Sequence, residues 1–318
     1  GCAEEPAETI EGLDILALAI EPTEVEVRTG PDGGEPVTFS VTATFENGVA
    51  RPLEVVEWTL SNQSVGELDE QGVFTPAATN GGEAWVTARL DNLDAQANLK
   101  VIYEDTLEAE DGLDPDAFGE PQATLEDAWL YPEDGVNLPR NTPSIRFQWK
   151  GDPKLGDAEA WRLSLRSATT DLTVLTREVW WEADDETWQT IAATNAGGQV
   201  EVELTAATAG GLLQAAPMVI NVNRMDASGS ILYWSTSTEG FMEIPYGGQS
   251  EEFLTINQTG RCQGCHAVSS RGYLAFTYDG GNGSLGVVDM DGMGEVLAGD
   301  GQFFGNFKTF SPDGRYLA

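Results

Sequence analysis

Short stretches in which apolar and polar residues alternate run along most of the chain. One covers residues 37–45 (VTFSVTATF) and ends at Asn47-Gly48, a dipeptide that favours tight turns. Similar stretches occur at residues 83–88 (EAWVTA) and 97–101 (ANLKV). Alternation with a period of two places successive side chains on opposite faces of a β-strand. Helical periodicity is scarce, so the pattern predicts an all-β protein in which short strands form sandwiches.

Four spaced motifs follow one another in the first third of the chain. They are residues 58–62 (WTLSN), 65–69 (VGELD), 72–76 (GVFTP) and 82–88 (GEAWVTA). In this order they resemble a bacterial immunoglobulin-like domain of the Big-2 type, over about residues 13–103. The resemblance implies an Ig-like β-sandwich, and such domains mostly serve as spacers or adhesive modules on cell surfaces.

Residues 104–127 contain ten acidic residues and no basic one. This composition predicts a solvated, extended linker. A low-affinity Ca²⁺ site is the alternative, because carboxylate oxygens are abundant, although no EF-hand spacing supports it.

A second β-rich region covers about residues 128–246. Its expected strands include residues 145–149, 161–165, 200–204, 218–222 and 231–234. An early strand with a tryptophan and a late Tyr-Trp pair resemble a fibronectin type III-like sandwich.

Six of the nine tryptophans lie between Trp129 and Trp188. Sugar stacking is one use for such residues, but core packing is the expected one because Trp has the largest apolar area. Adjacent strand residues face opposite ways, so one member of Trp180-Trp181 should be exposed.

The motif that carries chemistry is Cys262-Gln263-Gly264-Cys265-His266. C-x-x-C-H is the attachment signature of c-type haem, in which two thiols bind the porphyrin and the adjacent imidazole binds the iron. Three alternatives stay open: a disulfide or redox pair, half of a zinc site, and coincidence. The flanking residues 255–260 and 273–276 look extended, whereas small c-type cytochromes wrap the motif in helices.

His266 is the only histidine, so a second axial ligand from this chain cannot be histidine. The nearest downstream methionines are Met290 and Met293, and the nearest upstream one is Met242. Each is a candidate sixth ligand, although methionine more often fills gaps in a core.

A repeat follows the motif. Residues 269–275 (SSRGYLA) are similar to residues 311–318 (SPDGRYLA), and residues 310–315 (FSPDGR) resemble the signature of TolB-like (PD40, WD40-like) propellers. The resemblance implies that residues 247–318 hold the motif segment and the first blade of a truncated propeller. A C-x-x-C-H motif before such a repeat resembles large surface proteins of myxobacteria-type lineages.

Charge and the N-terminus bear on location. With 16 Lys+Arg against 53 Asp+Glu, the net charge is −37, which excludes nucleic acids and anionic lipid headgroups as partners.

The first residues resemble a bacterial lipoprotein whose lipidated residue is Cys2, with residues 1–12 as a tether. A free or disulfide-bonded Cys2 is the alternative. We therefore expect an exported lipoprotein at the outer membrane or cell surface, whose only membrane contact is the lipid.

These inferences favour a c-type cytochrome-like surface protein that transfers electrons to a redox partner. The alternative is a non-enzymatic adhesion or interaction lipoprotein that binds protein or glycan, with Cys262–Cys265 as a structural disulfide. A secreted enzyme with its active site elsewhere in a longer protein is a third option. No P-loop, G-x-S-x-G or H-E-x-x-H motif points to a hydrolase or transferase.

Overall fold

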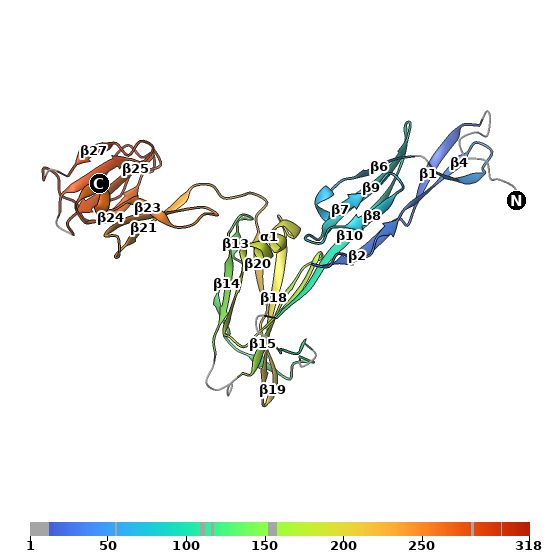
Figure 1. The fold of residues 1–318 in the computed structure, drawn as a ribbon, viewed down its shortest axis with the longest axis horizontal. Coiled ribbons are helices and arrows are strands. Elements are labelled where there is room, and N and C mark those ends of the chain that lie inside the picture. Colours follow the sequence, from blue (N-terminus) through green and yellow to red (C-terminus); the bar gives the residue numbers. More distant parts are fainter. Residues whose placement is uncertain are drawn as a thin grey trace. The chain divides into compact units, whose positions relative to one another are not determined.

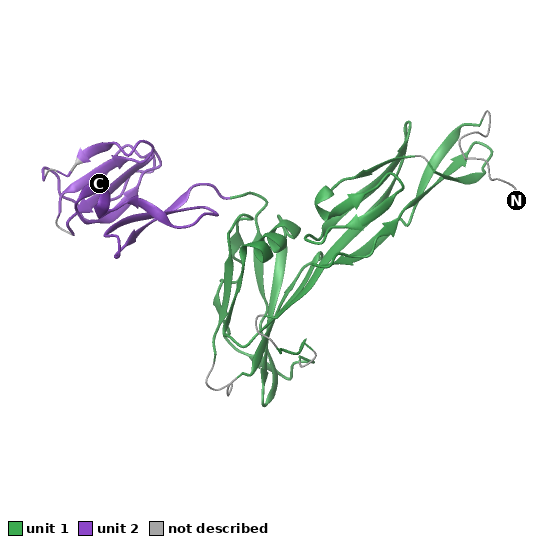
Figure 2. Cartoon of the chain, viewed as in Figure 1, with its two compact units in different colours: residues 1–226 green, residues 227–318 purple. Residues whose placement is uncertain are grey.

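The structure is a computed structural model that describes residues 13–54, 56–108, 112–115, 118–151, 158–280, 283–299 and 301–318. In these ranges strands predominate, which confirms the all-β prediction. The chain divides into two units, residues 1–226 and 227–318 (Figure 2). Cys2 and the predicted tether lie outside the described residues. None of the described helices combines the length and the hydropathy that a membrane span needs.

The first part of unit 1 is a β-sandwich (Figure 1). One layer contains β2 (Glu24–Thr29), β10 (Leu93–Glu108), β9 (Gly82–Leu90) and β6 (Glu57–Leu60). The facing layer contains two three-stranded sheets. One consists of β1 (Ile15–Glu21), β4 (Ser40–Phe45) and β5 (Ala50–Leu53), and the other of β3 (Val37–Thr38), β8 (Val73–Pro76) and β7 (Gly66–Leu68). The 3₁₀ turn η1 (Gln63–Val65) precedes β7. Alternate residues such as Phe39, Val41, Phe74, Val86 and Leu99 are buried in one shared core.

The second part of unit 1 is also a sandwich. Its larger sheet contains, in spatial order, β11 (Ala123–Leu125), β19 (Gly211–Ala215), β18 (Gln199–Thr208), β15 (Ala160–Arg166) and β16 (Thr170–Thr176). Strand β18 also pairs with β20 (Met218–Val222), and β20 pairs with β13 (Asn137–Leu138). The smaller sheet contains β12 (Trp129–Tyr131), β14 (Ile145–Trp149) and β17 (Trp180–Ala183). Helix α1 (Asp185–Thr194) begins at the N-cap Asp184 and buries Trp188.

Tryptophans fill the core between these two sheets. Trp149, Trp161 and Trp188 are almost fully buried, which agrees with the packing role expected for them. Of the adjacent pair, Trp181 is 8% exposed and Trp180 is 38% exposed, so the predicted alternation is confirmed.

Strand β10 belongs to both sandwiches. Its first part pairs with β9 and with β2, and its residues 103–108 pair in parallel with β16. The acidic linker expected from residue 104 therefore begins as strand, because Glu104, Thr106 and Glu108 remain in the β10 ladder. Arg28 adds a bridge across this junction, with its guanidinium 2.7 Å from Glu104 and 3.4 Å from Asp171.

Unit 2 contains two antiparallel sheets. One consists of β21 (Ser230–Ser235), β22 (Gly240–Pro245) and β23 (Glu251–Leu254), and the other is a meander of β24 (Gln263–Val268), β25 (Tyr273–Tyr278), β26 (Leu285–Asp289) and β27 (Glu295–Ala298). Phe241 and Leu254 from the first sheet pack with Phe276 from the second. This shared core explains why β21 and β22 belong to unit 2 and not to the second sandwich, in which we expected residues up to 246.

Candidate cofactor site

The Cys-x-x-Cys-His motif lies where the chain enters β24. The preceding short helix α2 (Ile256–Thr259) is capped by Thr255 and ends at Gly260, whose φ of 70° turns the chain out of the helix. The backbone N–H of Asp279 then donates to the carbonyl of Cys262 at 2.9 Å, which fixes the first cysteine beside β25. The motif therefore leads into a strand. Of its two flanks, residues 273–276 are extended in β25 as expected, whereas residues 255–260 were expected to be extended and instead form the capped helix α2.

A β-bulge occupies the middle of the motif. Gly264 pairs with Thr277 and Ala267 with Ala275, so Cys265 and His266 together face the single residue Phe276. Cys265 has a φ of 47°, a left-handed conformation that is uncommon for a residue with a side chain. Bulges re-aim side chains and often occur beside active sites, and here Cys265 is exposed.

The two thiols are unbridged and lie in different surroundings. Cys262 is half-buried. Burial, together with the carboxylates of Glu239 and Asp279, raises the pKa of the Cys262 thiol. A thiol with a raised pKa stays protonated near neutral pH, unlike the thiolates of disulfide oxidoreductases.

Lys308 reaches the second cysteine from a distant part of the sequence. Its ammonium donates to the carbonyl of Cys265 at 2.7 Å and to the hydroxyl of Thr277. Burial lowers the pKa of Lys308. These bonds fix the backbone of the bulge at Cys265. Lys308 lies 43 residues downstream of Cys265, so no local sequence pattern indicates them.

The imidazole of His266 packs on an aromatic side chain. Its ring centroid lies 4.8 Å from that of Phe241, with the planes inclined by 56°. Among the described contacts neither ring nitrogen has a hydrogen-bond partner. The ring is thus restrained by packing and keeps its nitrogens available for coordination.

Arg261 links the start of the motif to the meander. Its guanidinium lies 2.7 Å from the Asp279 carboxylate, donates to the carbonyl of Gly299 at 3.1 Å and lies 4.2 Å above the ring of Tyr278. Arg261 directly precedes the motif, but nothing in its local pattern indicates these partners.

The methionines considered as sixth ligands are placed differently. Met290 packs against the cluster that contains Phe241, whereas Met293 is 41% exposed in a turn. Met242 accepts a hydrogen bond from the Thr238 hydroxyl at 3.6 Å. Of the three, Met290 shares a hydrophobic cluster with the aromatic ring that contacts His266.

The donor set fits covalent haem attachment in its chemistry, since two free thiols and an available imidazole are adjacent in the chain. The described residues contain no group of three or more His, Cys, Asp or Glu side chains that could hold a metal ion by themselves, at the motif or in the described part of residues 104–127.

Comparisons with known proteins leave the family open. No family model matches the chain, and no curated protein does. Among solved structures, the S-layer protein rSbsC(31-844) aligns at 10% identity and a TM-score of 0.23. The alignment covers 89% of this chain and 40% of the rSbsC chain. A tandem of titin Ig domains aligns at 11% identity and a TM-score of 0.19, over 66% of this chain and 95% of the titin chain. Extracellular domains 3–5 of Drosophila OTK align at 10% identity and a TM-score of 0.18, over 66% of this chain and 61% of that one.

Proposed function

We propose that this chain belongs to an exported carrier of single electrons, with one haem attached through Cys262 and Cys265 and with His266 as an iron ligand. The observation that supports the proposal is that a half-buried thiol just before β24, an exposed thiol in its bulge and an available imidazole beside that thiol lie within residues 262–266.

The thiols would form the covalent bonds to the porphyrin, and the neighbouring residues would position the motif. Each thiol would add across one vinyl group of the porphyrin, with a new bond from Sγ to one vinyl carbon and the thiol proton transferred to the other, so that no oxidant is consumed. A bound haem would supply reversible one-electron chemistry at its iron. Phe241 restrains the imidazole of His266, while Arg261 and Lys308 hold the backbone on either side of the two cysteines.

The remaining parts would present this site at the cell surface. A lipid on Cys2 would anchor the chain, and the two sandwiches of unit 1 would act as spacers. The meander β24 to β27 runs in sequential order, as the strands of a propeller blade do, and supports the assignment of residues 247–318 to the start of a TolB-like propeller.

The deciding experiment is export of the chain in a host that has the machinery for c-type haem attachment. We expect a Soret band, sharp reduced α and β bands, and colour that persists after denaturation. The Cys262→Ser/Cys265→Ser variant should lose the covalent colour. His266→Ala should keep the covalent pigment but change its spectrum. Met290→Leu, compared with Met293→Leu, tests the sixth ligand.

A colourless chain from that host, with the mass of the free thiols or of a disulfide, would overturn the haem proposal. The second candidate is then a surface protein that binds other macromolecules, with a Cys262–Cys265 disulfide. Large exposed aromatic side chains in unit 2 favour it, since such side chains often mark interaction sites. They are Phe303, Phe304, Phe307 and Tyr316.

A further inference from the structure

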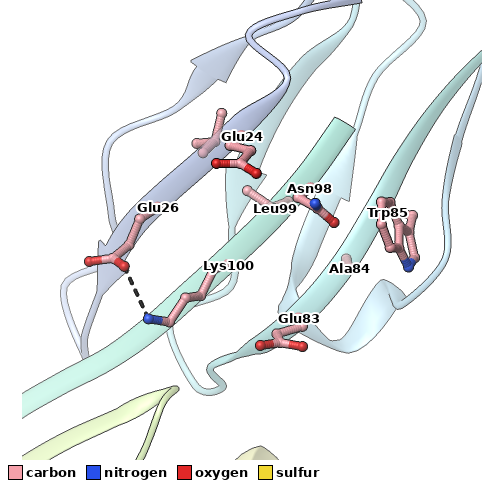
Figure 3. Close-up of a pocket in the computed structure, with 9 residues that line it drawn as sticks. Glu24, Glu26, Glu83, Ala84, Trp85, Asn98, Leu99 and Lys100 are labelled. Carbon is pink, nitrogen blue, oxygen red and sulfur yellow. Dashed lines mark hydrogen bonds and ion pairs between the residues drawn. The ribbon is translucent and has the colours of Figure 1, made fainter. Parts of the chain in front are cut away.

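We propose that the outer face of β2, β10 and β9 in unit 1 binds a neutral saccharide, with the indole of Trp85 as the surface on which a pyranose ring stacks. The face carries an open depression of about 770 Å³, which Figure 3 shows. Its location and chemistry are independent of the Cys-x-x-Cys-His motif in unit 2.

Strand pairing places the outward side chains in two rows. Glu24, Asn98 and Trp85 are register partners in one row, and Glu26, Lys100 and Glu83 in the next. The rows cross three hydrogen-bonded strands, so the positions of these side chains are set by the sheet and not by a loop. Sites built on such elements are positioned more accurately than sites on loops.

Trp85 is exposed in the interior of a strand. Its neighbours Ala84 and Val86 are buried, and the alternation turns the indole outward, where 49% of the residue is exposed. The backbone is fixed by a bond of 2.7 Å from the Trp85 N–H to the Ser61 hydroxyl and one of 3.0 Å from the Ser61 N–H to the Trp85 carbonyl. Exposed Trp on a rigid strand supplies a flat apolar surface at little entropic cost.

The polar groups around Trp85 include both hydrogen-bond donors and hydrogen-bond acceptors. Lys100 donates to Glu26 at 3.0 Å, and the Asn98 amide, between Glu24 and Trp85 in Figure 3, offers a donor and an acceptor. A sugar ring presents apolar C–H groups on its faces and hydroxyls around its rim, and so matches an indole surrounded by such groups.

The charges select against an anionic ligand. Glu24, Glu26 and Glu83 would repel uronic acids, sulfated sugars and phosphates, on a chain whose net charge is already −37. The ammonium of Lys100 lies within the same depression but is paired with the Glu26 carboxylate at 3.0 Å, so it does not offset this repulsion. Hydroxyl-rich neutral chains satisfy both sets of groups without burying an unpaired charge.

The test is affinity electrophoresis of the full chain in gels that contain one soluble polysaccharide each. The neutral probes are hydroxyethylcellulose, galactomannan, laminarin and dextran, and the polyanionic probes are alginate and polygalacturonate. We expect retardation by at least one neutral probe and by neither polyanion. Trp85→Ala should weaken the retardation at least about tenfold, Trp85→Phe should restore part of it, and Asn98→Ala and Glu83→Gln should weaken it several-fold.

The matched control is Trp180→Ala. Trp180 is 38% exposed on a strand of the same unit, but the guanidinium of Arg146 lies 4.6 Å from its ring centroid. Its removal should leave the mobility in every gel unchanged. Normal mobility of the wild-type chain in all four neutral gels would overturn the proposal. So would a Trp85→Ala variant that is retarded as strongly as the wild-type chain while its circular dichroism spectrum shows the wild-type fold. Neither result depends on haem.

Discussion

The side chain of Arg271 donates a hydrogen bond from Nε to the backbone carbonyl of Asp313 at 2.8 Å, across one sequence repeat of 42 residues. Ser270 makes the equivalent contact to the carbonyl of Pro312 at 3.2 Å, also 42 residues away. The similar segments 269–275 and 311–318 therefore contact one another turn against turn in unit 2. Neighbour-to-neighbour contact of this kind is how repeat proteins stabilise successive units.

This contact predicts different effects of alanine at the two equivalent glycines, Gly272 and Gly314. Both have positive φ, of 80° and 67°, so alanine costs about 1–2 kcal/mol at either one. At Gly314 the new Cβ would also lie 2.5 Å from the Ser269 hydroxyl, whereas nothing lies within 4 Å at Gly272. Hydrogen exchange of the peptides covering β24 and β25 should show the larger loss of protection for Gly314→Ala. Equal losses would mean that the turns do not contact each other in solution.

The bulge predicts a stabilising substitution. Cys265→Gly removes the side chain from a left-handed conformation and should raise the free energy of unfolding of unit 2 by about 1 kcal/mol. Cys262→Gly, at a position without positive φ, should give no gain. Urea denaturation of the haem-free chain, followed by hydrogen exchange in unit 2, measures both. A loss of stability in Cys265→Gly would show that the thiol makes a favourable contact that outweighs the strain.

The reactivity of Cys262 should depend on pH in a defined direction. Because burial and the carboxylates of Glu239 and Asp279 raise the pKa of its thiol, iodoacetamide should alkylate Cys262 more slowly than a free cysteine at pH 8, and the rate should rise only at more alkaline pH. The protonated thiol contributes its full stability at neutral pH, and this contribution is lost as the pH rises through the folded-state pKa. Glu239→Gln removes one of the charges that raise the pKa and should speed the reaction. Peptide mapping by mass spectrometry separates the cysteines, and a faster reaction at Cys262 than in an unfolded peptide would contradict the assignment.

The junction in unit 1 predicts a loss of cooperativity in Gly81→Ala. A Cβ at position 81 would lie 2.2 Å from the Thr169 carbonyl, which accepts the hydrogen bond from the Tyr103 N–H at 3.0 Å. We expect a cost of roughly 1–3 kcal/mol. The fluorescence and circular dichroism transitions of unit 1 in urea should coincide in the wild type and separate in the variant. Gly119→Ala, with nothing within 4 Å, is the control and should change neither.

Salt should stabilise the chain. With 53 acidic and 16 basic residues, repulsion between carboxylates opposes folding, and the screening length falls from about 10 Å at 0.1 M salt to about 3 Å at 1 M. Exposed ion pairs such as Lys100–Glu26 weaken on screening, but each is worth at most about 1 kcal/mol. Differential scanning calorimetry should therefore show melting temperatures that rise with NaCl concentration. A fall would mean that the ion pairs outweigh the net repulsion.

Alternation along the chain was enough to predict β9, the first half of β10 and the opposite orientations of Trp180 and Trp181, because each depends on a local period of two. Helix α1 was missed although Asp184 caps it, since the short helix has only a few apolar residues to mark a period. The pairing of β10 with β16 joins residues such as Tyr103 and Thr170, and no local pattern indicates partners so far apart.

At the candidate site, the motif itself identified Cys262, Cys265 and His266. The bulge, the Phe241 contact and the approach of Lys308 arise from the packing of unit 2 and depend on residues distant in sequence. A motif specifies which atoms are present, whereas their exposure and their pKa values follow from the fold.

The shared strand also has a mechanical consequence. β10 runs parallel to β2 over residues 98–103 and parallel to β16 over residues 103–108. Tension applied along β10 loads the hydrogen bonds of each parallel ladder together in shear, instead of opening them one after another as in a hairpin pulled from its open end. Force transmitted along unit 1 would therefore have to break several backbone hydrogen bonds at once before the two sandwiches separate.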